Sequence, residues 1–333
     1  MAKRVIVLCS GGLDSLLSMK IMERAGLDVL GVHFITWFNT PKYRLPEDFA
    51  DEQYNSLGFR IRNIDLSEAY TAILLHPRYG YGREVNPCMD CKILFFQKAK
   101  ELMERSGADF VASGEVLGQR PMTQRPDALR LIEKRSELSG YLLRPLSAKL
   151  LAPTIPEQLG WVDRNSLFGI SGRSRIRQME LAREFGIEQY PSPAGGCILT
   201  EKQFGKRFRD LIGCSGEVDT ADLTILRYGR HFRLSPDCKL VLGRDQRENE
   251  FLRRVGWGNL QLEPLNTPGP LGLLSWTGKK SHFKMALAIA ARYCDHSSIP
   301  VSIRFRIGYA GRLRDLTYQG TPDKSLCEEK LVK

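Results

Sequence analysis

No apolar run in this chain of 333 residues approaches the length of a membrane-spanning helix, and residues 1–25 lack the pattern of a signal peptide. We therefore expect a cytoplasmic protein rather than a membrane or secreted one. The glycine-rich patterns of the P-loop NTPases and of the dinucleotide-binding folds are also missing. The eight cysteines are too few for a disulfide-stapled scaffold in a chain of this length. The remaining composition, 42% hydrophobic and 9% aromatic, is that of an ordinary globular protein.

Positive charge is in excess. The formal net charge is +11 and the isoelectric point is near 9.3. Such a balance favours a polyanionic partner, although a basic enzyme without one is the alternative. The length predicts two domains.

The N-terminal stretch carries the clearest pattern. An apolar run, Val5–Cys9, predicts a strand, and a helix is expected from about Leu13. Between them, two glycines in Ser10–Ser15 (S-G-G-L-D-S) allow a tight turn. Free N–H groups and the helix dipole converge at such a turn, so we expect it to bind the phosphates of a nucleotide. An ordinary turn with a serine cap is the alternative.

The pattern downstream is that of an α/β protein with a doubly wound parallel sheet. Strands are expected at Asp28–Thr36, Phe59–Asp65 and Asp109–Val116, with a helix ending near Gly58 and another over Met89–Ser106. The polar loop Leu117–Pro126 follows the third of these strands. It is either a solvated surface or a basic loop beside the active site.

We place a first domain at 1–213 and a smaller α+β domain at 222–333. In the second domain short strands are expected, with one helix over Phe283–Tyr293. The short strand segments are Leu223–Tyr228, His231–Leu234, Lys239–Gly243, Leu271–Trp276 and Val301–Ile307. Relative to its length this part carries about twice the net positive charge of the first.

Three cysteines form a candidate site. Cys88 and Cys91 lie one turn apart on the predicted helix, so both sulfurs can reach one metal centre. Cys197 follows two glycines that leave its thiol accessible. The sequence has neither a second C-x-x-C pair nor clustered histidines to close a zinc site. Three thiolates suit a 4Fe–4S cluster with one iron open to an external ligand. A reactive dithiol and an unrelated cysteine are the alternative.

Ser10–Ser15 resembles the S-G-G-x-D-S signature of the PP-loop ATP pyrophosphatases, which split ATP into AMP and pyrophosphate to adenylate a carbonyl oxygen. With Asn86-Pro87-Cys88-x-x-Cys91, Ala112–Glu115 and Gly195-Gly196-Cys197, residues 1–213 resemble the PP-loop tRNA thiolation enzymes. These are the 2-thiouridylases and 4-thiouridine synthetases. In several members the matching cysteines hold a 4Fe–4S cluster, and in others the late cysteine carries a persulfide. Cys88 stands where the 2-thiouridylases commonly have aspartate, and this favours the cluster.

The resemblance implies a fold of the adenine nucleotide alpha hydrolase type and assigns roles to residues of this chain. Asp14 would help to hold Mg²⁺, Ser15 would bind phosphate, and Cys197 would take part in sulfur transfer. The cluster ligands would be Cys88, Cys91 and Cys197. Glu115 stands where many members have histidine, so it is given no role. The residues expected to bind ATP are Cys9, Ser10, Gly11, Gly12, Leu13, Asp14, Ser15, His33, Phe34 and Gly114.

Val241–Glu250 resembles the signature of the NFACT-R RNA-binding domain, which is known as an appendage of thiouridine-synthetase-like proteins. A plain surface turn is the alternative. The expected function is ATP-dependent thiolation of tRNA uridine, with tRNA and a sulfur donor, free sulfide or a persulfide carrier, as partners. A homodimer would be compatible with the sequence. The alternatives are a PP-loop enzyme acting on a small molecule and a non-enzymatic iron–sulfur RNA-binding protein.

Overall fold

The computed structural model describes residues 2–49, 52–54, 58–190, 196–214, 216–296, 299–321 and 323–332. The chain divides into two compact units. The first comprises Met1–Thr36 and Pro46–Cys197, and the second comprises Trp37–Leu45 and Ile198–Lys333. Each unit has its own sheet and its own hydrophobic core.

The first unit is built on a six-stranded sheet in the order β3-β4-β2-β1-β5-β6. Five neighbouring strands run parallel, and β3 pairs antiparallel at one edge. The expected doubly wound parallel sheet is therefore confirmed. Its strands are β1 (Arg4–Leu8), β2 (Asp28–Ile35), β3 (Glu52–Tyr54), β4 (Arg60–Asp65), β5 (Phe110–Ser113) and β6 (Leu142–Leu143).

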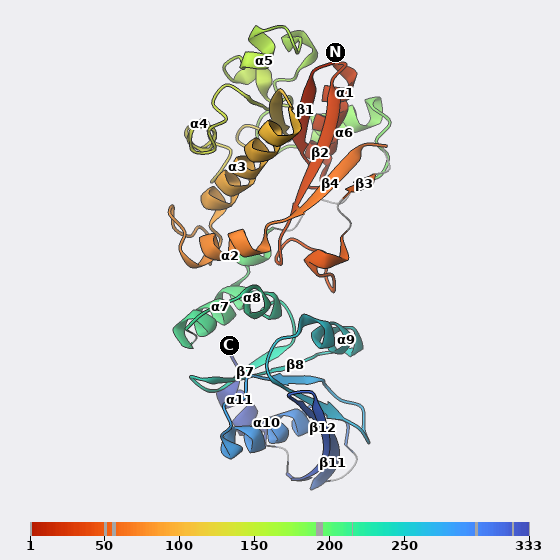
Figure 1. Cartoon of the computed structure of the whole chain (residues 1–333), viewed down its shortest axis with the longest axis vertical. Coiled ribbons are helices and arrows are strands. Elements are labelled where there is room, and N and C mark those ends of the chain that lie inside the picture. Colours follow the sequence, from red (N-terminus) through yellow and green to blue (C-terminus); the bar gives the residue numbers. More distant parts are fainter. Residues whose placement is uncertain are drawn as a thin grey trace. The chain divides into compact units, whose positions relative to one another are not determined.

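Helices cover both faces of this sheet. Figure 1 shows α1 and α6 on one side and α3 and α4 on the other. The central strands β1 and β5 have almost continuously buried side chains because helices pack on both faces. The helices are α1 (Leu13–Arg24), α2 (Ser67–Leu75), α3 (Cys88–Ser106), α4 (Pro126–Arg135), α5 (Ile155–Gln158) and α6 (Ile176–Glu184).

The second unit contains an antiparallel sheet in the order β12-β11-β9-β10-β8-β7. Figure 1 shows α10 and α11 on one face of it and α8 and α9 on the other. The strands are β7 (Arg230–Ser235), β8 (Cys238–Leu242), β9 (Leu260–Pro264), β10 (Gly272–Leu274), β11 (Val301–Tyr309) and β12 (Arg312–Gly320). The helices are α7 (Lys202–Cys214), α8 (Thr220–Ile225), α9 (Gln246–Val255), α10 (Lys280–Arg292) and α11 (Lys324–Lys330).

Two segments differ from the secondary structure predicted for them. A helix was expected just before Gly58, but β3 pairs there with β4. A strand was expected over Leu223–Tyr228, but α8 occupies the first half of that segment because Asp219 and Asp222 form a capping box at its start. The turn expected within 190–197 falls largely on residues outside those that the structure describes.

The domain limits 1–213 and 222–333 remain a prediction, and the compact units divide the chain differently. Helix α7 lies within the predicted first domain but packs with the second unit. So does the segment Trp37–Leu45, which leaves the end of β2. Trp37 is almost fully buried and stacks on Phe204 of α7, with ring centroids 6.0 Å apart. Arg227 donates to the carbonyl oxygens of Trp37 and Thr40.

The core of the second unit includes a buried ion pair. The Lys239 ammonium lies 2.8 Å from the Asp210 carboxylate, which also pairs with Arg233 at 2.8 Å. Burial lowers the pKa of Lys239 to about 8, against the opposing effect of Asp210. Burial by itself would raise the pKa of Asp210, but the pairing with Arg233 and Lys239 outweighs burial and lowers this pKa.

We predict that Asp210→Asn destabilises the second unit by about 3 kcal/mol, because it leaves Lys239 buried without its partner. Urea denaturation measures this, and the exposed Asp295→Asn is the control. The Asp210 contribution is complete above its unfolded pKa of 3.8 and is lost as the pH falls through its lower folded value. Adding Lys239→Met to the variant should restore much of the stability. Equal stability of the wild type and Asp210→Asn at pH 7 would contradict the prediction.

Candidate ATP and sulfur-transfer site

The loop Ser10–Ser15 joins the carboxyl end of β1 to the N-terminus of α1. Gly11 has φ of +73°, which favours glycine, and Gly12 caps the helix without any side-chain hydrogen bond. The Ser10 hydroxyl accepts from the Gly12 amide at 3.4 Å, and no side-chain cap bonds the first turn of α1 among the described residues. The amide dipoles of this 12-residue helix are available to an anion at the carboxyl edge of the sheet.

Three of the predicted ATP-binding residues have side chains that shape the loop rather than face outward. The Ser15 hydroxyl donates to the Gly12 carbonyl at 2.7 Å and accepts from the Ser10 amide at 3.3 Å. Cys9 and Leu13 are buried in the core, and burial raises the pKa of the Cys9 thiol. These residues can meet a ligand through their main chain.

Asp14 is the side chain on which other elements converge. The Gln119 amide donates to Asp14 Oδ2 at 3.1 Å, and the guanidiniums of Arg120 and Arg175 act on the carboxylate electrostatically. Burial raises the pKa of Asp14 against these groups. Asp14 Oδ1 is buried and has no hydrogen-bond partner among the described residues. This carboxylate oxygen is therefore available to a cation.

Gln178 of α6 is a second buried group with unused hydrogen-bonding capacity. It is fully buried beside Asp14, where a hydrogen bond from it lowers the pKa of that carboxyl group, and its polar atoms have no other partner among the described residues. Unsatisfied buried polar groups are costly, so a pair of them facing one spot indicates a ligand site. Sequence reasoning missed Gln119 and Gln178. The only hint was the basic loop beginning at Leu117, which was judged equally compatible with a solvated surface.

Gly114 packs directly against the loop at the end of β5. A Cβ at this position would lie 2.5 Å from the Asp14 carbonyl carbon and oxygen, and 2.7 Å from the Ser15 nitrogen. Only glycine allows β5 and the start of α1 to approach so closely. The predicted place of Gly114 beside the loop is thus explained by packing.

We predict that Gly114→Ala displaces the loop, destabilises the first unit by about 1–3 kcal/mol and weakens ATP binding. Gly213 in α7 provides the control, because a Cβ there meets nothing within 4 Å. Gly213→Ala should be neutral or stabilising by up to about 1 kcal/mol. Denaturant titration and calorimetric ATP binding measure the two effects. Unchanged ATP affinity in a folded Gly114→Ala protein would contradict the prediction.

His33 and Phe34, the predicted adenine contacts, point to opposite faces of the sheet because they are neighbours on β2. Phe34 is buried and packs against Phe95 of α3, with centroids 5.4 Å apart, so its ring belongs to the core. His33 lies opposite Asn63 of β4. Burial lowers the pKa of His33, and its contact with Asn63 opposes this.

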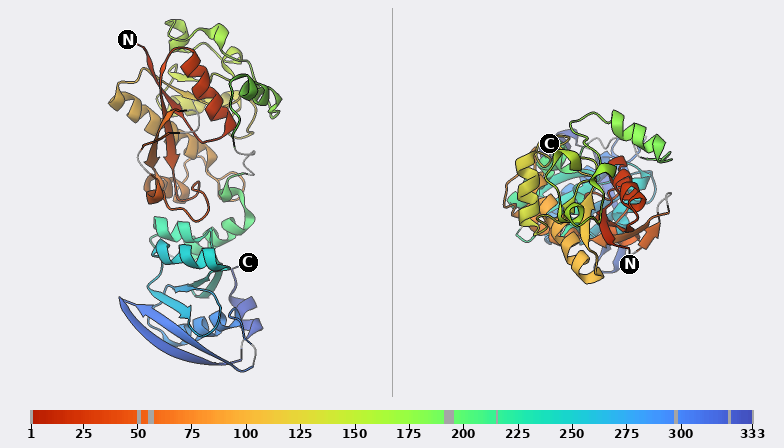
Figure 2. Two further views of the ribbon diagram at one scale, coloured as in Figure 1. Left: turned by 90° about the vertical axis from the view of Figure 1, so that its right-hand side faces the viewer. Right: turned by 90° about the horizontal axis from the view of Figure 1, so that it is seen from above.

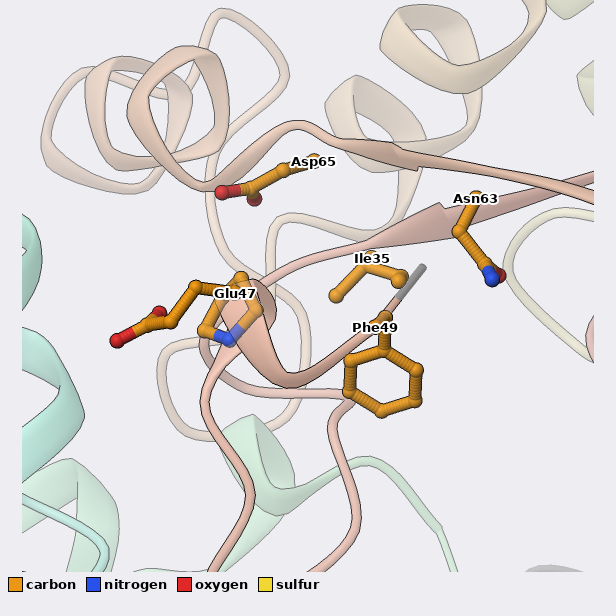
Figure 3. Close-up of a pocket in the computed structure, with 6 residues that line it drawn as sticks. Ile35, Glu47, Phe49, Asn63 and Asp65 are labelled. Atoms are coloured by element: carbon orange, nitrogen blue, oxygen red, sulfur yellow. The ribbon is translucent and has the colours of Figure 1, made fainter. Parts of the chain in front are cut away.

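A pocket of about 230 Å³ opens next to this pair, at the carboxyl ends of β2 and β4 (Figure 3). It is lined by Ile35, Pro46, Glu47, Phe49, Asn63 and Asp65. In Figure 3 the Phe49 ring and the Asn63 amide border the same space. Strands lie about 5 Å apart, so the pocket is about 10 Å from the loop, across β1, β2 and β4.

All three candidate cysteines lie within electrostatic range of Tyr70 of α2. Burial raises the pKa of this phenol, and the charges of Cys91, Cys197 and Cys88 would raise it further. Burial also raises the pKa of the Cys91 thiol to about 12, and it raises the pKa of the Cys88 thiol as well. All three cysteines are partly exposed as residues, although the Cys91 thiol itself is buried. Among the described residues, however, no three Cys, His, Asp or Glu side chains are arranged to hold a metal ion.

Glu115 follows Gly114 and is buried in an ion-pair network. Its carboxylate lies 3.0 Å from the Arg144 guanidinium and 3.3 Å from the Lys92 ammonium. Although burial opposes it, these two cations lower the pKa of Glu115. The burial of the Glu115 carboxylate is therefore explained by its ion pairs with Arg144 and Lys92, without a catalytic role.

The signature within Val241–Glu250 has an architectural role. Glu248 accepts hydrogen bonds from the Gly229 and Arg244 amides, and the Asn249 oxygen accepts one from the Leu271 amide at 2.9 Å. A Cβ at Gly243 would collide with Asn249. These contacts fix the connection between β8 and α9.

Comparison with known families assigns both units. Residues 3–156 match the family described as the tRNA methyl transferase HUP domain, and residues 229–326 match the NFACT protein RNA binding domain. The chain therefore contains a HUP domain with a PP-loop followed by an NFACT RNA-binding domain. The predicted resemblance to both families is confirmed.

Curated relatives carry the name tRNA-specific 2-thiouridylase MnmA. The one from Listeria welshimeri is 25% identical over 68% of this chain and 61% of its own length. One from Listeria monocytogenes is 25% identical over 76% and 72%. One from Mannheimia succiniciproducens is 29% identical over 69% and 58%. The chain thus spans less than two thirds of the first and third relatives.

No helix among the described residues is long and apolar enough to cross a membrane.

Proposed function

We propose that this protein is an ATP-dependent tRNA uridine thiolase. The observation that carries the proposal is the buried Asp14 carboxylate with the Gln178 amide beside it, at the start of α1 next to the loop Ser10–Ser15. The relatives named tRNA-specific 2-thiouridylase and the NFACT RNA-binding domain support tRNA as the acceptor.

The reaction replaces one uracil carbonyl oxygen by sulfur. The oxygen attacks the α-phosphorus of ATP, pyrophosphate leaves, and the uracil is adenylated. Hydrosulfide then attacks the activated carbon, and the oxygen departs with AMP. One proton is released, and no oxidant or reductant is needed. Main-chain amides at the start of α1 would stabilise the charge that develops on the phosphates.

ATP would bind with its phosphates on Ser10–Ser15 and its adenosine in the pocket beside His33 and Asn63. Asp14 fits a Mg²⁺ ion, because Oδ1 is a buried carboxylate oxygen without a partner among the described residues. Bound Mg²⁺ would neutralise phosphate charge. Arg120 and Arg175, which act on the same carboxylate electrostatically, would contact the phosphates.

Cys88, Cys91 and Cys197 would handle the sulfur. Three thiolates are the donor type that a 4Fe–4S cluster requires, and such a cluster would supply an iron open to an external ligand. The side chains as they lie do not form a metal-holding group among the described residues. A persulfide on Cys197 is the alternative that these contacts also accommodate. The two are distinguished by iron and acid-labile sulfide in anaerobically purified protein.

The deciding experiment supplies ATP, Mg²⁺, sulfide and unmodified bulk tRNA, and maps thiolated nucleosides by mass spectrometry. Thiolated uridine, formed with stoichiometric AMP and pyrophosphate, is the expected result. A PP-loop enzyme acting on a small molecule would instead turn over ATP without RNA and leave the tRNA unmodified. That outcome would overturn the proposal.

A further inference from the structure

The β11–β12 hairpin of the second unit carries an exposed aromatic contact. Tyr309, at the end of β11, is 44% exposed and packs edge-on against Trp276, with ring centroids 5.2 Å apart. Trp276 also packs against Phe283 of α10 at 6.0 Å, and its indole N–H donates to the Lys279 carbonyl at 3.1 Å. The two rings are therefore held in place at the boundary between the hairpin and the start of α10. Figure 2 shows how far the hairpin extends.

Exposed cations lie on the same hairpin and helix as this aromatic contact. Arg312 is the direct cross-strand neighbour of Tyr309, and Arg314 is that of Ile307, so both arginines share the Tyr309 face of the hairpin. Lys280 and Lys284 lie one turn apart on the exposed side of α10. None of these four side chains makes an ion pair within the described part of the chain.

Two acidic side chains near this face already have cationic partners. Asp315 points to the opposite face of the hairpin, where it pairs with Arg306 at 3.6 Å. Asp237 lies 3.7 Å from Lys279, and both are exposed. We call the set Trp276, Tyr309, Lys280, Lys284, Arg312 and Arg314 the aromatic–basic strip.

We propose that the aromatic–basic strip binds a single-stranded segment of the RNA substrate, with bases stacking on Tyr309 and Trp276 and phosphates on the four cations. Aromatic rings beside unpaired cations suit single-stranded RNA, because every base has a face that can stack on a ring and every phosphate carries a negative charge. A purely charged surface would not need rings held in this way. The inference deepens the proposed function and rests on its RNA acceptor.

The hairpin offers its own control. Arg304 and Arg306 lie on the opposite face of β11, so Arg304→Gln with Arg306→Gln removes the same charge from the same element. Arg312→Gln with Arg314→Gln tests the strip, and Tyr309→Ala tests stacking. Both strip changes affect exposed side chains, so the fold should be retained, and circular dichroism checks this.

The experiment measures binding of the full chain to a fluorescent 12-nucleotide single strand, to a duplex of the same length and to bulk tRNA. Tyr309→Ala should weaken single-strand binding about 5- to 100-fold. The Arg312/Arg314 variant should reduce the slope of log K against log salt by about 1.4. The Arg304/Arg306 variant should bind as the wild type does.

Several outcomes would overturn the inference. One is wild-type RNA affinity in both strip variants. Another is an equal loss in the Arg304/Arg306 control, because the effect would then be general charge. Equal affinity for single strand and duplex would remove the stacking role. Thiolation activity of the wild type is measured separately. If the wild type thiolates tRNA and the strip variants bind RNA with wild-type affinity, the strip is rejected and the proposed function is not.

Discussion

Asp14→Ala should lower ATP–pyrophosphate exchange by about 10²–10³-fold or more, because it removes the carboxylate that would hold Mg²⁺ at the developing phosphate charge. The exchange assay follows radiolabelled pyrophosphate into ATP in the presence of tRNA. Asp14→Asn keeps the size of the side chain and should be nearly as defective. Affinity for RNA should be unchanged, since the proposed RNA contacts lie in the second unit.

Asp127→Asn is the matched control for this carboxylate. Asp127 is exposed on α4 and pairs only with Arg125 among the described contacts. Its variant should exchange pyrophosphate at the wild-type rate. An Asp14→Ala protein with full exchange activity would remove the PP-loop from the mechanism. Loss of RNA binding in the same variant would indicate misfolding rather than a catalytic defect.

Cys197→Ser should abolish formation of thiolated uridine while adenylation of the tRNA continues, because the sulfur step follows the ATP step. Cys88→Ser and Cys91→Ser should do the same if all three thiols act together around Tyr70. Cys214→Ser is the control, since this cysteine is also partly exposed but belongs to the second unit. Mass spectrometry of the tRNA and AMP release measure the two steps separately.

These cysteine variants also decide how the sulfur is carried. With a cluster, each of the three substitutions should lower bound iron and the visible absorption of the anaerobic protein. With a persulfide, iron is absent from the wild type, and a transferable sulfur on Cys197 is detected by alkylation and mass spectrometry. Thiolation by the Cys197→Ser protein at the wild-type rate would contradict both versions.

The sequence predicted the parts of the site that are encoded locally. Strand β1, the loop Ser10–Ser15 and the start of α1 follow one another directly, so hydrophobic pattern and glycines were sufficient. Cys88 and Cys91 were predicted to share one helix, and they lie in the first turn of α3. The parallel order of strands followed from their alternation with helices.

Residues brought in by tertiary packing could not be predicted in this way. Gln178 lies 164 positions after Asp14 and looks like an ordinary helical surface residue until α6 packs on α1. Helix α9 was not predicted, since the only helix expected in the second domain was Phe283–Tyr293. Asp245 in fact caps the helix, and Gly256, with φ of +67°, ends it. Capping residues and turn residues are chemically the same, and only the partners distinguish them.

The segment Trp37–Leu45 has a consequence for how the protein is made. It belongs by packing to the second unit, yet Arg227, which holds it, comes 190 residues later than Trp37. At about 5–20 residues per second, a ribosome needs about 10–40 seconds to cover that distance. During most of that time Phe204, the ring on which Trp37 stacks in the folded chain, has not yet been made either. The segment Trp37–Leu45 can therefore complete its packing only after Phe204 and Arg227 have been synthesised.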